Sequence, residues 1–177
     1  STLNSQLKKY FLRFEGVGTY ATITVNGKDF GRHPIGRTTL TLDVTDELKQ
    51  GVNRLEVKAE HPEMIADMPW VCGGCSSEWG FSEGSQPLGI FRPVVLEVTD
   101  EIRIEPFGVH IWNDEKAANV SVETEVKNYS KTTETVELVN KLSNADGKQV
   151  FRLVEKVTLA PGEMKVIRQQ APVENPV

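Results

Sequence analysis

The chain has 177 residues, 38% of them hydrophobic and 25% charged, which is the composition of a soluble globular protein. Its net charge is −5, from 25 acidic and 20 basic residues, and the basic residues are scattered along the chain. Nucleic-acid binding depends on clustered Lys and Arg, so that class of function is excluded. No run approaches the roughly 18 consecutive apolar residues of a membrane-spanning helix, so we expect no membrane span.

The first sixty residues alternate between apolar and polar side chains with a period of two, which is typical of half-buried strands. Asn26-Gly27 is a dipeptide preferred in tight hairpins, because both residues tolerate a positive φ. Residues 45–51 depart from the strand pattern and predict a short helical turn, which Thr45 or Asp46 caps and Gly51 ends. Apolar strand faces are expected at Tyr10, Leu12, Phe14, Ala21, Ile23, Val25, Leu40, Leu42, Val44, Leu55, Val57 and Ala59.

The alternation disappears over residues 61–88 and returns at Val94. An irregular segment of this length inside a compact domain is commonly functional. It carries Trp70, Trp79 and Phe81. Their flat apolar faces suit either stacking on sugar rings or packing against protein.

Cys72 and Cys75 have the spacing C-x-x-C. A structural zinc site needs four ligands, and the three histidines (His33, His61 and His110) lack the spacing of such sites. A thioredoxin-like redox motif needs a βαβ setting, which this sequence lacks. We therefore expect a local disulfide or two free thiols, with no metal and no cofactor. A disulfide forms in an oxidising compartment, so we expect a periplasmic or secreted protein, although the start STLNSQLKKY contains no signal peptide.

Beyond Asp100 a second series of short strands begins, with turn signals at NYS (128–130), DG (146–147) and PG (161–162). Such strands and turns over about 75 residues predict an immunoglobulin-like sandwich. We place the boundary near Glu101, which gives two domains, residues 1–100 and residues 101–177. The expected core is Leu40, Leu42, Leu55, Val57 and Leu96 in the first domain, and Val122, Val126, Leu138, Leu153 and Val166 in the second.

An ordered set of short runs carries a family resemblance. The runs in the first domain are FLRFEGV (11–17), ATITVNG (21–27), LDVTDELKQGVNRL (42–55) and GIFRPVVLE (89–97). Those in the second are VKNYS (126–130), DGK (146–148), LAPGE (159–163) and PVENPV (172–177). Together they resemble the amino-terminal region of glycoside hydrolase family 2, which includes β-galactosidases, β-glucuronidases and β-mannosidases. Each run alone is only a strand or a turn, and the specificity lies in their order.

The resemblance implies an all-β fold: a jelly-roll (galactose-binding-like) sandwich followed by an immunoglobulin-like sandwich. The family's jelly roll has a strand ahead of the position of Tyr10, and its catalytic carboxylates lie in a barrel that would follow Val177. The chain is therefore expected to be a fragment that lacks both. Its expected function is that of a non-catalytic accessory region of a β-glycosidase, with carbohydrate and the absent catalytic barrel as partners.

Two alternatives stay open: an independent carbohydrate-binding module with an immunoglobulin-like spacer, and a structural sandwich pair of the adhesin type. The candidates for contact with carbohydrate or with the barrel are Trp70, Glu78, Trp79 and Phe81. Packing is favoured over sugar contact for the aromatic residues. A catalytic role for Glu78 with Glu83 is disfavoured, because retaining glycosidases hold two carboxylates about 5–5.5 Å apart on a rigid frame. We expect no catalytic residue in this chain.

Overall fold

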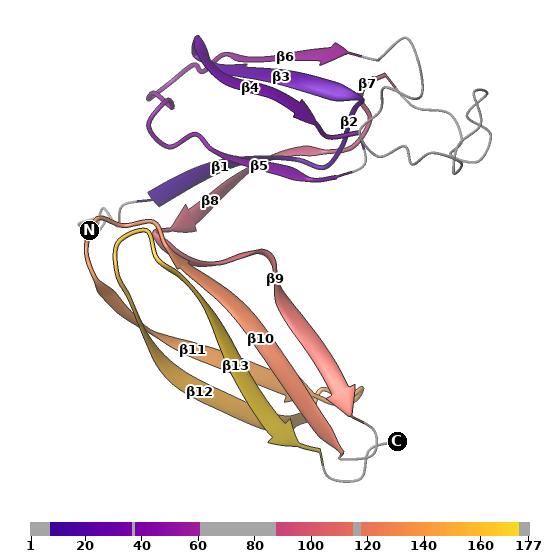
Figure 1. Cartoon of the computed structure of the whole chain (residues 1–177), viewed down its shortest axis with the longest axis vertical. Helices are drawn as coiled ribbons and strands as arrows, with labels where there is room; N and C mark the ends of the chain where they lie inside the picture. Colours follow the sequence, from indigo (N-terminus) through magenta and orange to yellow (C-terminus); the bar gives the residue numbers. More distant parts are fainter. Residues whose placement is uncertain (1–7, 37, 61–87, 115–117, 174–177) are drawn as a thin grey trace, which may run out of the picture. The chain divides into compact units, whose positions relative to one another are not determined.

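The computed structural model describes residues 8–36, 38–60, 88–114 and 118–173, and every regular element among them is a strand (Figure 1). These residues form two compact units, one from Lys8 to Val98 and one from Thr99 onward. The predicted all-β fold class is confirmed.

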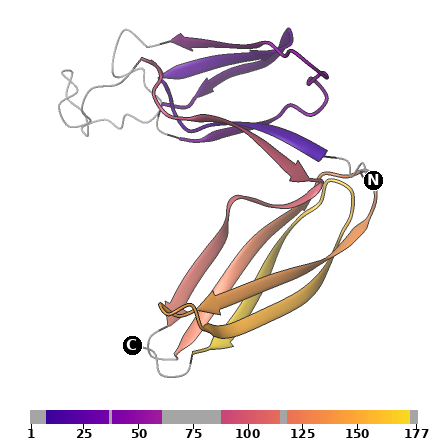
Figure 2. The same ribbon diagram turned by 180° about the vertical axis from the view of Figure 1, so that it is seen from behind.

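The first unit contains two three-stranded sheets, with the orders β5-β1-β8 and β4-β3-β6, and β2 pairs with β7 (Figures 1 and 2). Its strands are β1 (Lys8–Phe14), β2 (Val17–Gly18), β3 (Tyr20–Val25), β4 (Lys28–Pro34), β5 (Leu40–Asp43), β6 (Leu55–Glu60), β7 (Gly89–Ile90) and β8 (Val94–Asp100).

The core of the first unit follows from the period-two pattern, because alternate residues of β1 and β3 point to the same side of their sheets. Its buried residues are Leu12, Phe14, Val17, Ala21, Ile23, Val25, Ile35 and Val44. Burying a side chain the size of Phe14 or Ile23 stabilises the fold by about 1.5–3 kcal/mol. The predicted apolar faces of these two strands are therefore confirmed.

The turn between β3 and β4 is built on Asn26 and Gly27, whose φ angles of 50° and 90° are those of a primed hairpin turn. The Asn26 side chain also holds residues from a distant segment. Its Nδ2 donates to the carbonyl oxygen of Glu47 and to Asn53 Oδ1, each at 2.8 Å, and its Oδ1 accepts from the backbone N–H of Arg54 at 2.9 Å. The Asn26 amide is thus fully used in the fold.

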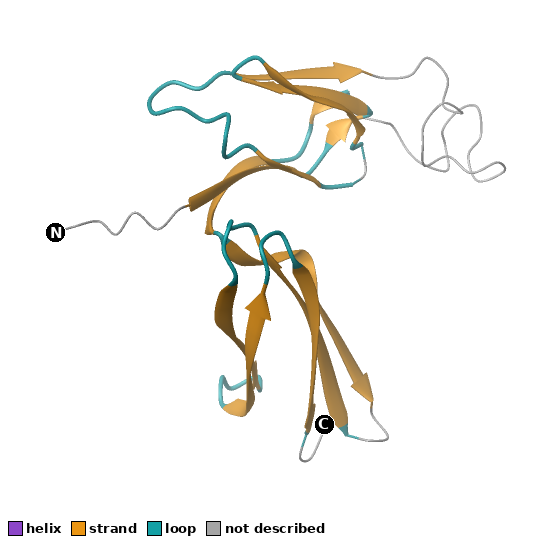
Figure 3. Cartoon of the chain, turned by 60° about the vertical axis from the view of Figure 1, so that its left-hand side comes forward, coloured by secondary structure: helices purple, strands orange, loops and turns teal. Residues whose placement is uncertain are grey.

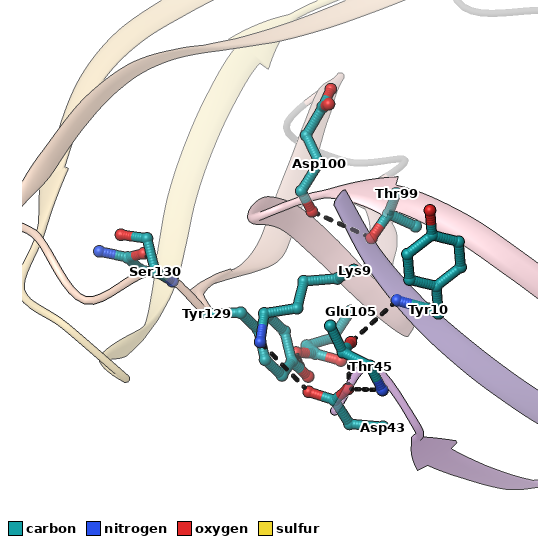
Figure 4. A network of polar contacts seen from close by, with 10 residues as sticks. Lys9, Tyr10, Asp43, Thr45, Thr99, Asp100, Glu105, Tyr129 and Ser130 are labelled. Carbon is teal, nitrogen blue, oxygen red and sulfur yellow. Dashed lines mark hydrogen bonds and ion pairs between the residues drawn. The ribbon is translucent and has the colours of Figure 1, made fainter. Parts of the chain in front are cut away.

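The predicted helical turn at residues 45–51 is a single turn, in which the N–H groups of Glu47 and Leu48 donate to the carbonyl oxygen of Val44. Its capping residue lies earlier than predicted, because Asp43 Oδ1 accepts from the backbone N–H of Thr45 at 3.0 Å. Thr45 Oγ1 in turn accepts from the backbone N–H of Tyr10 at 3.0 Å (Figure 4). The turn is therefore fastened to β1.

The second unit is a sandwich of the sheets β13-β10-β9 and β11-β12, whose two layers are visible in Figure 3. Its strands are β9 (Ile102–Asp114), β10 (Asn119–Asn128), β11 (Glu134–Ser143), β12 (Gln149–Leu159) and β13 (Met164–Pro172). The turns predicted at DG (146–147) and PG (161–162) are present: Gly147 and Gly162 have φ angles of 79° and 73°, which a residue with a side chain rarely adopts.

The two layers of the second unit are joined by apolar packing at one end and by polar contacts in the middle. Val126, Leu138, Val157 and Leu159 form the apolar cluster. In the middle, three residues bridge the sheets: the Asn140 amide nitrogen lies 3.3 Å from Thr124 Oγ1 and 2.9 Å from Gln169 Oε1. Because each of these polar groups has a partner, their burial is tolerated.

Two of the five core residues predicted for the first unit are wrong. Leu40, Leu42 and Val57 pack against the core, whereas Leu55 and Leu96 are exposed. Leu55 is the first residue of β6, and Leu96 lies on the edge strand β8. Neighbouring strands therefore cover these two side chains incompletely.

Four of the five core residues predicted for the second unit are at least partly covered. Val122, Val126 and Leu138 are buried, and Leu153 is half-buried. Val166 is exposed, and its prediction is wrong.

The prediction failed at Val166 because it assigned the wrong one of the two alternating sets of β13 residues to the inner face. The register places Val166 opposite Glu125 on the outer face of the sheet, and Ile167 opposite the buried Thr124. Two adjacent apolar residues, Val166 and Ile167, leave the inward position ambiguous in the sequence, and Gln169 hides the true inward series because it is polar.

Candidate functional site

The irregular segment starts and ends at the same place on the first unit. The backbone N–H of Thr19 donates to the carbonyl oxygen of Glu60, the last residue of β6, at 3.0 Å. Gly18, the residue before Thr19, pairs with Gly89, the first residue of β7. Residues 60 and 89 therefore flank one dipeptide, at the edge where β6, β2 and β7 meet (Figure 1).

All the residues predicted from the sequence to act at this site lie outside the described residues. They are the candidates for carbohydrate or barrel contact, Trp70, Glu78, Trp79 and Phe81, and the cysteines Cys72 and Cys75. Their roles stay predictions. The described strand ends that flank the segment, those of β6, β2 and β7, are called the frame below.

One side of this frame is a close contact between two runs that are far apart in the sequence. The N–H of Phe91 donates to the carbonyl oxygen of Gly16 at 3.3 Å. A Cβ added at Gly16 would lie 2.8 Å from Phe91 Cζ, closer than side chains approach. A side chain at position 16 would therefore require the Phe91 ring, which is the end of a flexible and exposed side chain, to shift.

The other side of the frame is a polar cluster on the outer face of the β4-β3-β6 sheet. The Arg32 guanidinium lies 3.6 Å from the centroid of the Tyr20 ring, which is a cation–π arrangement. Arg32 Nε is also 3.3 Å from Glu60 Oε2, and Lys58 Nζ is 3.3 Å from Glu60 Oε1. The three strands thus contribute to one cluster beside the start of the irregular segment.

The charges of this cluster keep Glu60 ionised, which makes the cluster unsuited to donating a proton. The hydrogen bond from Lys58 contributes most, and with the charges of Lys58 and Arg32 it holds the pKa of Glu60 below its usual value. Glu60 is therefore a carboxylate at neutral pH and a poor general acid. Because Arg32 stacks on Tyr20, it also occupies one face of the ring that a sugar would need.

A second polar cluster lies in the second unit around Tyr129 (Figure 4). The Tyr129 hydroxyl donates to Glu105 Oε1, and Arg103 forms an ion pair with Glu105 at 3.0 Å. The Lys127 ammonium lies 4.5 Å from the centroid of the Tyr129 ring. Burial, and then the hydrogen bond to Glu105, raise the pKa of Tyr129 to about 12. The phenol stays protonated at neutral pH and acts as a structural donor.

A surface aromatic pair on β9 was not predicted from the sequence. The rings of His110 and Trp112 stack with their centroids 6.0 Å apart and an interplanar angle of 26°. Trp112 is half-exposed, and His110 Nε2 lies 3.8 Å from Glu125 Oε1. The alternation of side chains along β9 could have indicated this pair. Val109 and Ile111 face inward, so His110 and Trp112 lie on the outer face.

The described residues contain no group of three or more His, Cys, Asp or Glu side chains arranged to hold a metal ion. Among the same residues, no helix is long and apolar enough to cross a membrane.

Comparison with known proteins agrees with this architecture. Residues 1–68 match the model of the glycosyl hydrolase 2 galactose-binding domain-like family. Over 96% of the chain, the sequence is 27% identical to a β-glucuronidase of Formosa agariphila and 28% identical to a β-galactosidase of Bacteroides ovatus. The crystal structure of a Bacteroides uniformis β-glucuronidase superposes on 94% of the chain with a TM-score of 0.79 and 25% identity.

These matches cover 18%, 19% and 20% of the three relatives, so the chain spans about a fifth of their length. The chain is a pair of β-sandwiches, the first galactose-binding-like and the second immunoglobulin-like. It corresponds to the amino-terminal region of family 2 glycoside hydrolases, as the sequence motifs predict.

Proposed function

We propose that this chain is the non-catalytic accessory region of a β-glycosidase whose hydrolytic carboxylates reside in a barrel domain of the same polypeptide. The observation that carries the proposal is the anchoring of the irregular segment. The residues that flank it, Glu60 and Gly89, are held at Thr19 and Gly18 by backbone pairing, and Trp70, Trp79 and Phe81 fall between them in the sequence. A rigid frame is what a loop needs in order to present side chains to a neighbouring domain or substrate.

The polar groups of the described residues support an accessory role over an independent active site. Asn26 and Tyr129 are engaged in internal hydrogen bonds. The carboxylate beside the irregular segment, Glu60, is paired with two cations. Such groups stabilise a scaffold, whereas a retaining glycosidase needs one carboxylic acid that stays protonated near neutral pH.

The first experiment measures hydrolysis. The chain of residues 1–177 and the full-length natural polypeptide are assayed on chromogenic β-galactosides, β-glucuronides and β-mannosides. We expect no turnover by residues 1–177 and turnover of at least one substrate by the full-length polypeptide. Turnover by residues 1–177 that is lost on Glu78→Gln or Glu83→Gln contradicts the proposal.

The second experiment distinguishes packing of the irregular segment from sugar binding. If Trp70, Trp79 and Phe81 pack on the barrel, millimolar mono- and disaccharides leave the Trp fluorescence of residues 1–177 unchanged, and this is the result we expect. Saturable quenching that disappears on Trp79→Ala would assign the segment to sugar. Trp112→Ala is the matched control, because it removes an indole from the second unit.

A carbohydrate-binding module is the second candidate function, and the His110–Trp112 pair favours it. A half-exposed indole beside polar groups on the outer face of a sheet provides the kind of surface on which sugar rings stack. Quenching by sugars that is lost on Trp112→Ala and kept on Trp79→Ala would select this function and place it in the second unit.

We also propose a periplasmic or secreted location with a Cys72–Cys75 disulfide, on the basis of their C-x-x-C spacing. Intact mass with and without reduction tests it: the disulfide gives a two-hydrogen difference, and stoichiometric zinc in the purified protein contradicts it.

A further inference from the structure

The sequence Asn-Gly occurs once in the chain, at Asn26-Gly27, and this dipeptide can undergo deamidation. The backbone nitrogen of the glycine attacks Cγ of the asparagine, because a glycine has no side chain to block the approach. A bond from that nitrogen to Cγ forms, the bond from Cγ to Nδ2 breaks, and ammonia leaves with the proton of the glycine N–H. Water then opens the cyclic imide at either of its carbonyl carbons, which leaves aspartate or isoaspartate in place of the asparagine. Asparagine is for this reason a thermolabile residue.

The structure leaves the attacking group of this reaction accessible. Gly27 lies in the turn between β3 and β4, where it is exposed. A Cβ built on Gly27 would have no heavy atom within 4 Å apart from those of its chain neighbours. Water and base therefore reach the Gly27 N–H, and the position of the Asn26 carboxamide decides whether the reaction proceeds.

The Asn26 carboxamide is held against a segment that is distant in the sequence. Its Nδ2 donates to the carbonyl oxygen of Glu47 and to Asn53 Oδ1, each at 2.8 Å, and its Oδ1 accepts from the N–H of Arg54 at 2.9 Å. Closing the imide ring brings C, Cα, Cβ and Cγ of Asn26 nearly into one plane with the Gly27 nitrogen, an eclipsed arrangement that side chains avoid. The carboxamide must therefore leave its partners before Cγ can meet that nitrogen.

The segment that holds the carboxamide is itself closed by Asn53. Asn53 Oδ1 accepts from the N–H of Lys49 at 2.8 Å, and Asn53 Nδ2 donates to the carbonyl oxygens of Lys49 and Gly51 at 2.9 and 3.1 Å. The same Asn53 Oδ1 accepts from Asn26. Asn26 is thus released only when the turn of residues 47–54 opens.

We propose that Asn26 is a deamidation site that the fold keeps closed, and that its modification detaches residues 47–54 from the turn between β3 and β4. The reaction proceeds through openings of the 47–54 turn, and its product cannot be held in the same way. An ionised carboxylate at position 26 has no N–H to donate, so it would bring an oxygen to within 2.8 Å of two acceptors, the carbonyl oxygen of Glu47 and Asn53 Oδ1. This site is independent of any glycosidase activity.

The test compares Asn26 with a second Asn-Gly dipeptide in the same chain, created by Asp146→Asn. Position 146 lies in an exposed hairpin turn, and among the described residues the Asp146 side chain makes no hydrogen bond. Both sites are followed by Gly and Lys, which are Lys28 and Lys148, so the two should convert at similar rates in urea. In the folded variant we expect conversion of Asn26 to be at least about 10-fold slower than that of the site at position 146. Peptide mass spectrometry measures both conversions in one sample.

A variant of the holding segment tests the cause of the protection. Asn53→Ala removes an acceptor of Asn26 and the closure of the 47–54 turn. It should speed the conversion of Asn26 in the folded chain and leave the site created by Asp146→Asn unchanged. The NMR signals of the buried Ile23 verify that the first unit is folded. The comparison of the two sites in the parent chain does not depend on this variant.

The effect of the modification is measured on Asn26→Asp, which is one of its products. The N–H of Lys49 should exchange with solvent at least about 10-fold faster in this variant, because the carboxylate displaces Asn53. Ile23 is the internal control. It lies in β3, which is paired on both sides by β4 and β6, so the exchange of its amide should stay the same.

Three results would overturn the inference. Conversion of Asn26 as fast in the folded chain as in urea means that the fold does not close the site. Equal protection of Asn26 and of the site created by Asp146→Asn means that the geometry of a hairpin turn protects both, without the 47–54 segment. Unchanged exchange of Lys49 in Asn26→Asp means that the product stays attached.

Discussion

Replacing Asn128 by Ala should destabilise the second unit more than replacing Asn144, an amide in an exposed turn of the same unit. Asn128 is fully buried at the end of β10. Its Nδ2 donates to the carbonyl oxygens of Thr132, Leu159 and Ala160 at 2.8, 3.1 and 3.1 Å, and its Oδ1 accepts from the N–H of Ser130 at 2.8 Å. One side chain therefore fastens β10 to the end of β12 and to the following turn.

The magnitude follows from the groups left without partners. Asn128→Ala strands the buried N–H of Ser130 and the carbonyl oxygen of Leu159, and each unsatisfied buried group costs about 1–3 kcal/mol. We expect a loss of about 3 kcal/mol in the free energy of unfolding of the second unit. The assay is a urea titration followed by the NMR signals of Val126 and Leu138, which report on this unit alone.

The control is Asn144→Ala. Asn144 Oδ1 also accepts two backbone N–H groups, from Asp146 and Lys148, but in an exposed turn where water replaces the lost acceptor. We expect a loss below about 1 kcal/mol for this variant. Similar losses for both substitutions, or a loss below about 1 kcal/mol for Asn128→Ala, would refute the reasoning.

Asn128→Asp adds a test by pH. The new carboxyl group faces carbonyl oxygens and is buried, so its pKa in the folded state lies above its unfolded value of about 3.9. The folded state then binds more protons between the two pKa values, and stability falls as pH rises through that window. The variant should therefore be most stable below the unfolded pKa. A pH-independent loss would contradict the proposed contacts.

Three further predictions concern the frame and the polar clusters. Gly16→Ala should change the unfolding free energy of the first unit by less than about 1 kcal/mol, because the exposed Phe91 ring can shift away from the new Cβ. A urea titration of Gly16→Ala with and without Phe91→Ala measures the part that the ring contributes, and a loss well above about 1 kcal/mol would contradict this expectation. The pKa of Glu60, measured by carboxyl NMR titration, should lie below its usual value and rise more on Lys58→Met than on Arg32→Met; the reverse order would contradict the assignment of Lys58 as the main cause. Tyr129 should titrate near pH 12 in an ultraviolet difference titration against Tyr129→Phe, and titration near pH 10 would contradict this prediction. Because the pKa of Tyr129 is raised in the folded state, its contribution to stability is complete below pH 10 and is lost between about pH 10 and 12.

The fold is predictable from the sequence where the physics is local. Alternation placed Leu12, Phe14 and Ile23 in a core, and Asn26-Gly27 specified its turn, because period and positive φ are properties of neighbouring residues. Parity at Val166 was not predictable, since it depends on pairing with Glu125 in another strand.

Contacts between residues far apart in the sequence could not be predicted either. The stacking of Arg32 on Tyr20, and the contact between Phe91 and Gly16, join residues that only the sheet topology brings together. The His110–Trp112 pair could have been found, because the parity of β9 is readable once Ile111 is taken as inward. The roles of Trp70 and Trp79 stay predictions, since both lie outside the described residues.

The anchoring of residues 60 and 89 beside Gly18-Thr19 has a consequence for sequence variation. When the two ends of a segment are already held at one point, the entropy cost of closing it rises slowly with length, by about 0.6 kcal/mol for each doubling. Insertions, deletions and exchanges between these anchors therefore disturb the sandwich little. The length of the chain between these two anchors can therefore change while the sandwich that holds them stays constant.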